Sequence, residues 1–329
     1  MNRRFPPFLL SLLALCGLMI LPFVGNPFIG PEVLLRPASQ ELDSLIFWQI
    51  RIPRVLLAFL AGVGLSLGGL SFQAIFRNAL ATPFTLGVAG GASLGVTLWI
   101  YFGLQLSFFG ISGSSLAALS GALGSIALVY GIAKASDNLS PNSMLLGGVA
   151  MTFFFSSSIL LLQYLGDIGD TFRIIRWLMG DLSHANFDLV LQVLPFVATG
   201  VLIIALHARE LNLLSLHDDL AASRGVPVER TRLILFFFVS FMLAGIITTC
   251  GPIGFVGIMV PHICRLIAGA NHLRLVPITL VTGGFFLALC DTCARTLSSS
   301  TEIPVGIITA LLGGPFFLAL LFKKPNSLH

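Results

Sequence analysis

Charged residues are scarce in this chain. Asp, Glu, Lys and Arg make up only 10% of its 329 residues, whereas 56% are hydrophobic and the mean hydropathy is +0.97. Soluble domains contain roughly 45–50% apolar residues, so the composition excludes an ordinary soluble globular protein. No polar stretch is long enough for a separate soluble domain, and we expect residues 1–329 to form a single transmembrane domain.

Recognisable catalytic motifs are missing as well. No Walker A sequence, G-x-x-x-x-G-K-[ST], occurs anywhere, so the chain is not expected to hydrolyse ATP or to hold a cofactor of its own. No His-Glu-x-x-His pattern and no pair of acids on one helix indicates an intramembrane hydrolase. The sequence therefore predicts that this chain is not an enzyme.

Metal-ligating patterns are weak. Cys290 and Cys293, in C-D-T-C, have the spacing of redox or zinc motifs, but no second ligand pair accompanies them and their flanks are apolar. His217, Asp218 and Asp219 are consecutive, so on a helix they point in different directions. We predict no metal site, and we expect Cys290 and Cys293 to be buried small residues on one helical face. The other three cysteines, Cys16, Cys250 and Cys264, also lie in or beside apolar runs.

Long apolar runs are abundant. Most approach the roughly 20 residues that cross a bilayer as a helix. Nine such runs occupy residues 8–24, 54–74, 86–104, 116–133, 144–165, 189–206, 233–249, 276–289 and 306–322. A tenth, 258–268, is shorter and is either a buried span or half of a broken one. We predict an all-α polytopic membrane protein with about ten transmembrane helices.

The positions of Lys and Arg indicate the orientation. With an inside N-terminus and ten alternating spans, twelve of the eighteen basic residues fall on the cytoplasmic side. We therefore predict that both termini and segment 215–230 are cytoplasmic. The start, M-N-R-R before an apolar run, also fits a secretory signal, but Leu15 stands where cleavage needs a small residue. We expect an uncleaved first span.

A polar island, S-L-H-D-D-L-A-A-S-R-G-V-P-V-E-R at 215–230, separates two apolar runs. Ser215 and Asp218 have the spacing of a capping box, and Gly225 followed by Pro227 is a helix stop. The pattern predicts a short capped helix of perhaps ten residues. The alternative is an ordinary solvated loop helix.

Five motifs occur in a fixed order. They are R-I-P-R (51–54), Q-A-I-F-R-N-A-L-A-T-P (73–83), the polar island, G-P-I-G-F-V-G-I-M-V-P-H-I-C-R (251–265) and E-I-P-V-G-I-I-T-A-L-L-G-G-P-F-F (302–317). Together they resemble the permease subunit of type II ABC importers, from about residue 51 to the C-terminus. Ala79 departs from the pattern, because that family usually has proline after the asparagine.

The resemblance implies uptake of a metal chelate across a bacterial inner membrane, with a ferric siderophore as first choice and haem or cobalamin next. It implies a homodimer in the lipid membrane, two ATP-binding cassette subunits that hold ATP and Mg, a periplasmic binding protein, and no nucleic acid. A competing class, an ion-gradient-driven secondary transporter, would need carboxylates as relay groups in the membrane. Asp291 is instead expected to pair with Arg295 at i,i+4.

Three sets of site residues follow from the resemblance. Coupling helices at about 211–230 would dock on the ATPase through Leu216, Asp218, Asp219, Leu220, Ala222, Arg224 and Gly225. A cytoplasmic gate would comprise Asn78, Leu80, Asn142 and Ser143, for which ordinary loop caps are the alternative. The binding protein would dock on Arg51, Arg54 and Arg295, which otherwise would reach lipid headgroups or pair with Asp43, Asp291 or Glu302.

Overall fold

The computed structural model describes residues 7–25, 27–35, 42–108, 111–135, 140–297 and 302–322, which are almost entirely helical. The α-helices are α1 (Pro7–Ile20), α2 (Leu42–Leu45), α3 (Ile52–Ile75), α4 (Val88–Tyr101), α5 (Gly113–Ala135), α6 (Pro141–Leu165), α7 (Ile168–Leu178), α8 (Phe187–Leu206), α9 (Ala208–Leu214), α10 (Asp218–Ser223), α11 (Val228–Cys250), α12 (Val256–Ala268), α13 (His272–Thr296) and α14 (Val305–Phe322). Other helical turns are η1 (Leu21–Phe23), η2 (Pro31–Leu35) and η3 (Ile46–Arg51), the last a π-helix that continues into α3. The strands β1 (Ser107–Phe108) and β2 (Ile111–Ser112) pair before α5. The all-α class is confirmed.

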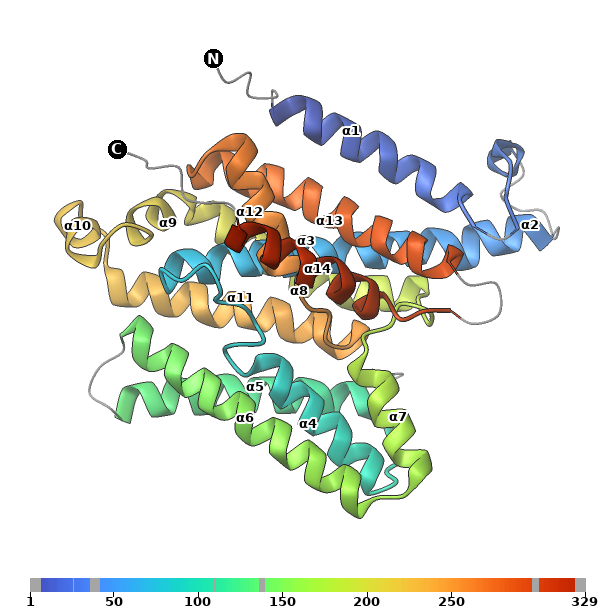
Figure 1. Cartoon of the computed structure of the whole chain (residues 1–329), viewed down its shortest axis with the longest axis horizontal. Coiled ribbons are helices and arrows are strands. Elements are labelled where there is room, and N and C mark those ends of the chain that lie inside the picture. Colours follow the sequence, from blue (N-terminus) through green and yellow to red (C-terminus); the bar gives the residue numbers. More distant parts are fainter. Residues whose placement is uncertain are drawn as a thin grey trace.

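Helix α3 lies at the centre of the molecule, between α13 and α11 (Figure 1). In the segment Leu42–Ile75, 83% of the most apolar window is buried inside the chain, against 22% in α6. An apolar helix that its own chain leaves uncovered has to face lipid or another subunit. Helix α3 therefore forms the core, and α6 forms an outer surface.

Glycines allow α3 to approach its neighbours closely. A Cβ atom on Gly62 would lie 2.2 Å from the carbonyl oxygen of Gly283 in α13, and one on Gly69 would lie 1.9 Å from that of Gly257 in α12. Both distances are far shorter than a van der Waals contact, so any larger residue would push the helices apart. The glycine clusters are packing motifs.

Ten helices in the described ranges are apolar, and they coincide with the ten predicted runs. Six are long enough to cross a membrane: Leu42–Ile75, Gly113–Ala135, Pro141–Leu165, Phe187–Leu206, Val228–Cys250 and His272–Thr296. Four are shorter: Leu12–Phe23, Val88–Tyr101, Val256–Ala268 and Val305–Leu320. Because a helix rises 1.5 Å per residue and the hydrocarbon core is roughly 30 Å thick, length alone supports the six.

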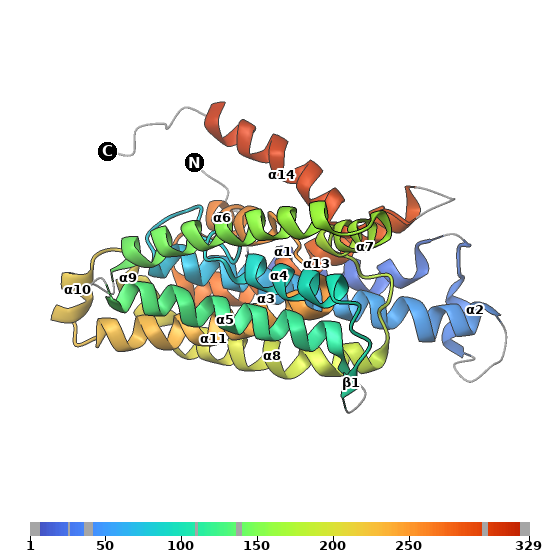
Figure 2. The ribbon, with the colours of Figure 1, turned by 90° about the horizontal axis from the view of Figure 1, so that it is seen from below.

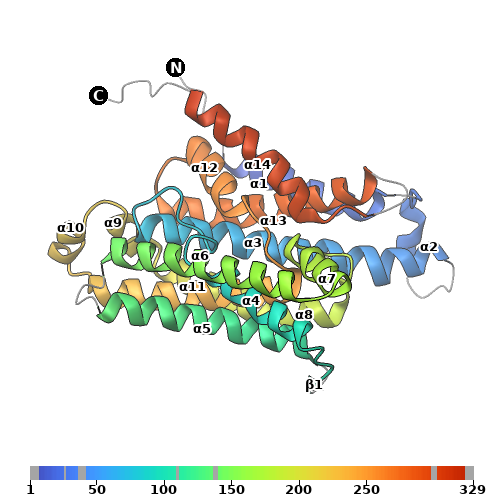
Figure 3. The same ribbon diagram turned by 60° about the horizontal axis from the view of Figure 1, so that its bottom comes forward.

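The long helices share one general direction, which gives the molecule two ends (Figure 2). Helix α10 projects at one, here called the α10 end, while α2 and α7 lie toward the other, the α7 end (Figure 3). Helix α14 lies along the outside in both views. This arrangement separates the predicted coupling residues from the predicted docking arginines.

The fold corrects two sequence expectations. Helix α7 was not predicted, although Asp167 is its N-cap and accepts a 2.7 Å hydrogen bond from the backbone N–H of Asp170. Cys290 and Cys293 were expected to be buried, but only Cys290 is, and Cys293 is exposed on its helix, as Cys16 is on α1. The expectation missed that Cys293 faces away from the core, toward lipid or a second subunit.

Candidate coupling, gate and docking sites

The polar island contains one short helix, α10 (Asp218–Ser223), between the end of α9 and the start of α11, and it is shorter than the ten residues predicted. Ser215 follows the last residue of α9, and its hydroxyl donates to the carbonyl oxygen of Asn212 at 2.9 Å. Helix α10 begins at Asp218 without a side-chain cap at His217. The predicted capping box is therefore wrong, because the Ser215 hydroxyl serves the end of α9 and the Asp218 carboxylate binds arginines.

Helix α10 ends at the predicted stop, just before Gly225. Gly225 has φ +82°, a left-handed conformation that favours glycine. The N–H of Val226 donates to the carbonyl of Ala221 at 3.0 Å, and the N–H of Gly225 donates to that of Ala222 at 2.9 Å. This pair of bonds is a Schellman motif, which ends α10 rigidly.

Helix α10 presents an exposed face with apolar residues in it. Leu216 and Leu220 are 56% and 38% exposed, while Ala221 on the opposite side is buried against the body of the chain. Asp219, Ala222, Arg224 and Gly225 are exposed as well. A short helix fixed by one face, with Leu220 exposed on it and Leu216 exposed in the turn before it, is suited to bind another protein.

Asp218 differs from the other island residues because it turns back toward the chain. Its Oδ1 accepts from Nη2 of Arg232 at 2.8 Å, and its Oδ2 lies 3.5 Å from Nη2 of Arg77. A polar cavity of about 590 Å³ adjoins this cluster. Its lining includes Phe76, Arg77, Ser140, Pro141, Asn142, Asp218, Val228, Glu229 and Arg232. The structure thus brings Asp218, a predicted coupling residue, beside Asn142, a predicted gate residue.

The other gate residues lie in capped loops. The side chain of Asn78 accepts from the N–H of Leu80 at 2.8 Å, and Ser140 caps α6 by accepting from the N–H of Ser143 at 3.1 Å. Leu80 is 53% exposed, and Asn78 and Asn142 are exposed too. These bonds agree with the loop-cap alternative, while the exposed side chains stay free to contact a second subunit.

Arg54 is buried in an ion-pair cluster at the α7 end. Its Nε and Nη2 donate to the two carboxylate oxygens of Asp291 at 2.9 and 3.0 Å, and its Nη1 donates to Glu302 at 2.7 Å. The side chains of Arg54 and Asp291 are 5% and 1% exposed, whereas that of Glu302 is 53% exposed. The predicted pair of Asp291 with Arg295 is therefore wrong, because Arg54 takes both oxygens of Asp291.

Arg51 and Arg295 bind backbone carbonyl groups of the segment that follows α1. Arg51 is 4% exposed and donates to Pro22 and Phe23 at 3.1 and 3.2 Å and also to Pro27. Arg295 donates to Leu21 at 2.8 Å. In this conformation the three predicted docking arginines are all used within the chain, and their docking role stays a prediction.

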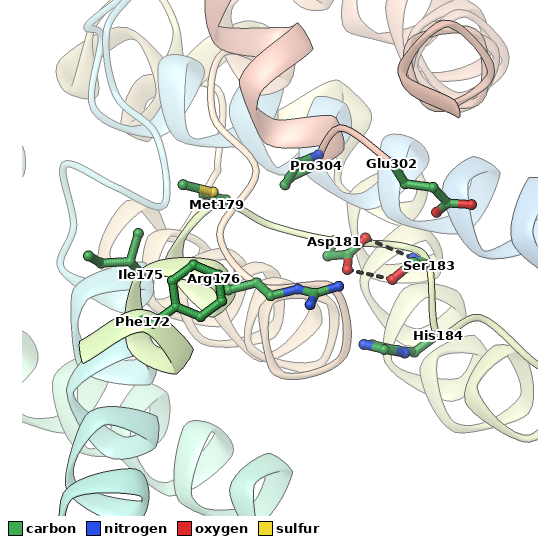
Figure 4. Close-up of a pocket in the computed structure, with 9 residues that line it drawn as sticks. All are labelled: Phe172, Ile175, Arg176, Met179, Asp181, Ser183, His184, Glu302 and Pro304. Carbon is green, nitrogen blue, oxygen red and sulfur yellow. Dashed lines mark hydrogen bonds between the residues drawn. The ribbon is translucent and has the colours of Figure 1, made fainter. Parts of the chain in front are cut away.

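A second polar cavity, of about 570 Å³, lies at the α7 end (Figure 4). Arg176 of α7 reaches toward Asp181 and Ser183, with His184 below them and Glu302 above. Partial burial works to raise the pKa of Asp181, but hydrogen bonds from the hydroxyl and the N–H of Ser183 outweigh it and hold this pKa below its ordinary value. An anionic carboxylate thus lies beside an arginine and a histidine.

The chain matches the FecCD transport family over residues 9–323. It belongs to this family. It is 34% identical to the iron(3+)-hydroxamate import system permease protein FhuG of Bacillus subtilis over 85% of this chain and 84% of that protein. It is 32% identical to the hemin transport system permease protein HmuU of Yersinia pestis over 98% of both chains. A solved structure described as an inward-facing metal-chelate type ABC transporter superimposes with a TM-score of 0.86 at 32% identity, covering 96% of this chain and 98% of that one.

The family resemblance predicted from the five motifs is confirmed. In this FecCD family member, sequence reasoning missed the cavity at the α7 end, although D-L-S-H at 181–184 is a polar cluster between apolar helices. It also missed Arg77 and Arg232 as partners of Asp218. Arg77 lies in the motif at 73–83 and Arg232 lies two residues after the polar island, and their 141- and 14-residue separations from Asp218 hide the contacts.

Proposed function

We propose that this chain is the transmembrane permease subunit of an ATP-driven importer that carries a metal chelate into a bacterial cell through the inner membrane. The observation that carries the proposal is the FecCD match along nearly the whole chain, residues 9–323. FhuG and HmuU are named for iron(3+)-hydroxamate and hemin, which favours a ferric siderophore as cargo, with haem or cobalamin next.

The proposed assembly contains two copies of this permease, two ATP-binding cassette subunits and a periplasmic binding protein. The poorly buried apolar helix α6 supports a partner or lipid beside it. We propose that the four shorter apolar helices cross the membrane with the six long ones, since buried neighbours can shield a short span. The α10 end and both termini would then be cytoplasmic, and the α7 end periplasmic.

The three sites receive these roles. Helix α10 would dock on the ATPase through Leu216 and Leu220, which are exposed beside polar groups. Leu80 and Asn142 would narrow the cytoplasmic end of the pathway between two copies. Docking of the binding protein at Arg54 would have to begin from Glu302, the exposed member of the ion-pair cluster, because Arg54 itself is buried.

The alternative is a secondary transporter driven by an ion gradient. Asp291, the carboxylate that such a transporter would use as a relay, does not support it. A relay carboxylate must exchange partners as it gains and loses a proton, but both oxygens of Asp291 are bonded to Arg54. The FecCD relatives are import-system permeases.

The test is uptake by the purified complex in liposomes, with the binding protein outside and ATP inside. Labelled ferric hydroxamate, haem and cobalamin would be supplied separately. We expect uptake of one cargo that stops without ATP and continues when an ionophore removes ion gradients. Uptake that survives without ATP and stops with the ionophore would contradict the proposal.

A further inference from the structure

We propose that Asp218 is a positioning residue that connects the coupling helix α10 to the gate loop, residues 77–82, through Arg77. The proposal rests on the proposed function, because it concerns how movement of α10 reaches the pathway. Three separate elements meet at this carboxylate: α10 itself, the turn after α3 and the first turns of α11.

The two oxygens of Asp218 hold two different arginines. The bond to Arg232 is short, at 2.8 Å, and the Arg232 side chain is only 5% exposed. The contact with Arg77 is longer, at 3.5 Å, and its two side chains are 31% and 35% exposed. Asp218 itself is 35% exposed, but breaking its bond to Arg232 would leave a nearly buried guanidinium without that partner, whereas the pair with Arg77 is partly exposed on both sides and weak. Asp218 is therefore fixed to α11 and adjustable toward Arg77.

Arg232 has a further reason to hold Asp218. Its Nε atom is buried and has no hydrogen-bond partner. A buried guanidinium with an unsatisfied donor depends on the carboxylate that it does contact. The bond to Arg232 thus opposes movement of α10 away from α11. A displacement of α10 that keeps this bond is easier, and it changes the contact between Asp218 and Arg77.

The backbone at Arg77 links the position of this residue to that of Asn78 and Leu80 in the gate loop. Arg77 has φ +48°, in the left-handed region where glycine is favoured. The N–H of Arg77 donates to Ala74 at 3.4 Å, and that of Asn78 donates to Gln73 at 3.2 Å, so both bonds fasten the turn to α3. Displacing Arg77 would shift Asn78 and, through its side-chain bond, Leu80.

The adjoining cavity provides space for this movement. It separates Arg77 and Asp218 from Asn142 at the start of α6, and Glu229 lines it from α11. An arginine released from Asp218 has Glu229 and the polar groups of Ser140 and Asn142 within the same cavity. The geometry points to an exchange of ion-pair partners, in which Arg77 leaves Asp218 for these groups when closure of the ATPase moves α10.

The test measures cargo transported per ATP hydrolysed in the reconstituted complex. Arg77→Gln should lower this ratio roughly fivefold or more, while ATP hydrolysis and the yield of assembled complex stay near wild type. Arg77→Lys keeps the charge and should restore most of the ratio. Arg274→Gln, an exposed arginine of α13 at the same end, is the matched control and should leave the ratio unchanged.

A double-variant cycle decides whether the two residues act through each other. Asp218→Asn should lower the ratio as well, and the double variant Asp218→Asn/Arg77→Gln should be no worse than the more impaired single variant. Multiplied effects in the double variant, or a full ratio in Arg77→Gln, would overturn the link. These outcomes require a wild-type complex with ATP-dependent uptake, and if the wild type lacks it, the proposed function fails instead.

Discussion

Individual side chains at the α7 end differ in what they can contribute to docking and to stability. Arg54 and Arg295 attract attention in the sequence because they are cations on the predicted periplasmic side. The structure explains their position without a partner, since one neutralises a buried acid and the other binds a carbonyl group. Substitution of Arg54 by an acidic residue would therefore break the buried pair with Asp291, whatever its effect on docking.

Arg54→Gln should lower the free energy of unfolding by about 3–5 kcal/mol, because it leaves Asp291 as an uncompensated buried charge. Glu302→Gln should cost only about 0–1 kcal/mol, since Glu302 is half exposed and Asp291 still neutralises Arg54. Thermal unfolding of the two variants in detergent would compare their stabilities. Equal, small losses would contradict the central role given to the Arg54–Asp291 pair.

Asp181 should make part of the stability depend on pH. Its pKa in the folded chain lies below the unfolded value of about 3.9, so its ionised form stabilises the fold at higher pH. This contribution is lost as pH falls through the lowered pKa. We expect Asp181→Asn to show a shallower decrease in melting temperature on acidification than wild type, and Ser183→Ala to lie between them. Parallel curves would show that Asp181 contributes nothing.

The coupling role proposed for helix α10 depends on the rigidity of the helix more than on its length. It has six residues, yet Ala221 and the Schellman bonds fix both its buried side and its end. A helix held in this way can move as one body when a partner pushes on its exposed leucines. A loop of equal length would absorb the displacement.

Gly225→Pro should uncouple ATP hydrolysis from uptake. Proline cannot adopt φ +82° and has no N–H to donate to Ala222, so the end of α10 would loosen. Gly225→Ala should show the same change more weakly. The control is Gly124→Ala in α5, where nothing lies within 4 Å of the added Cβ. Uptake and phosphate release from the same liposomes would be measured, and a normal uptake-to-hydrolysis ratio in Gly225→Pro would refute a coupling role for α10.

At the scale of the whole molecule, the long apolar runs predicted ten helices that the fold contains. The pairing of Arg54 with Asp291 and Glu302 was among the alternatives that the sequence offered, whereas the contact of Arg77 with Asp218 was missed because 141 residues separate them. A capping box was predicted for the island helix because Ser215 and Asp218 fit a local pattern. Tertiary contacts of Asp218 with Arg77 and Arg232 took precedence over that pattern.

A homodimer should place the gate loops of two copies near each other. Leu80→Cys in an otherwise cysteine-free chain is expected to crosslink to its equivalent in the closed state and less so when nucleotide opens the pathway. Ser223→Cys, on α10, should not crosslink between permease copies. Gel mobility after mild oxidation would report the product, and failure of Leu80→Cys to crosslink in every nucleotide state would remove the gate assignment.

The segment that follows α1 has an implication for biosynthesis. Carbonyl groups of Leu21, Pro22 and Phe23 accept hydrogen bonds from Arg51 and Arg295, and Arg295 lies 274 residues after Leu21. At about 5–20 residues per second, the ribosome needs roughly 14–55 s to make the chain between them. Helix α1 also packs on α13, where the ring of Phe285 covers Gly17. Helix α1 is therefore made well before α13, and its contacts with α13 can form only after that helix has been inserted as well.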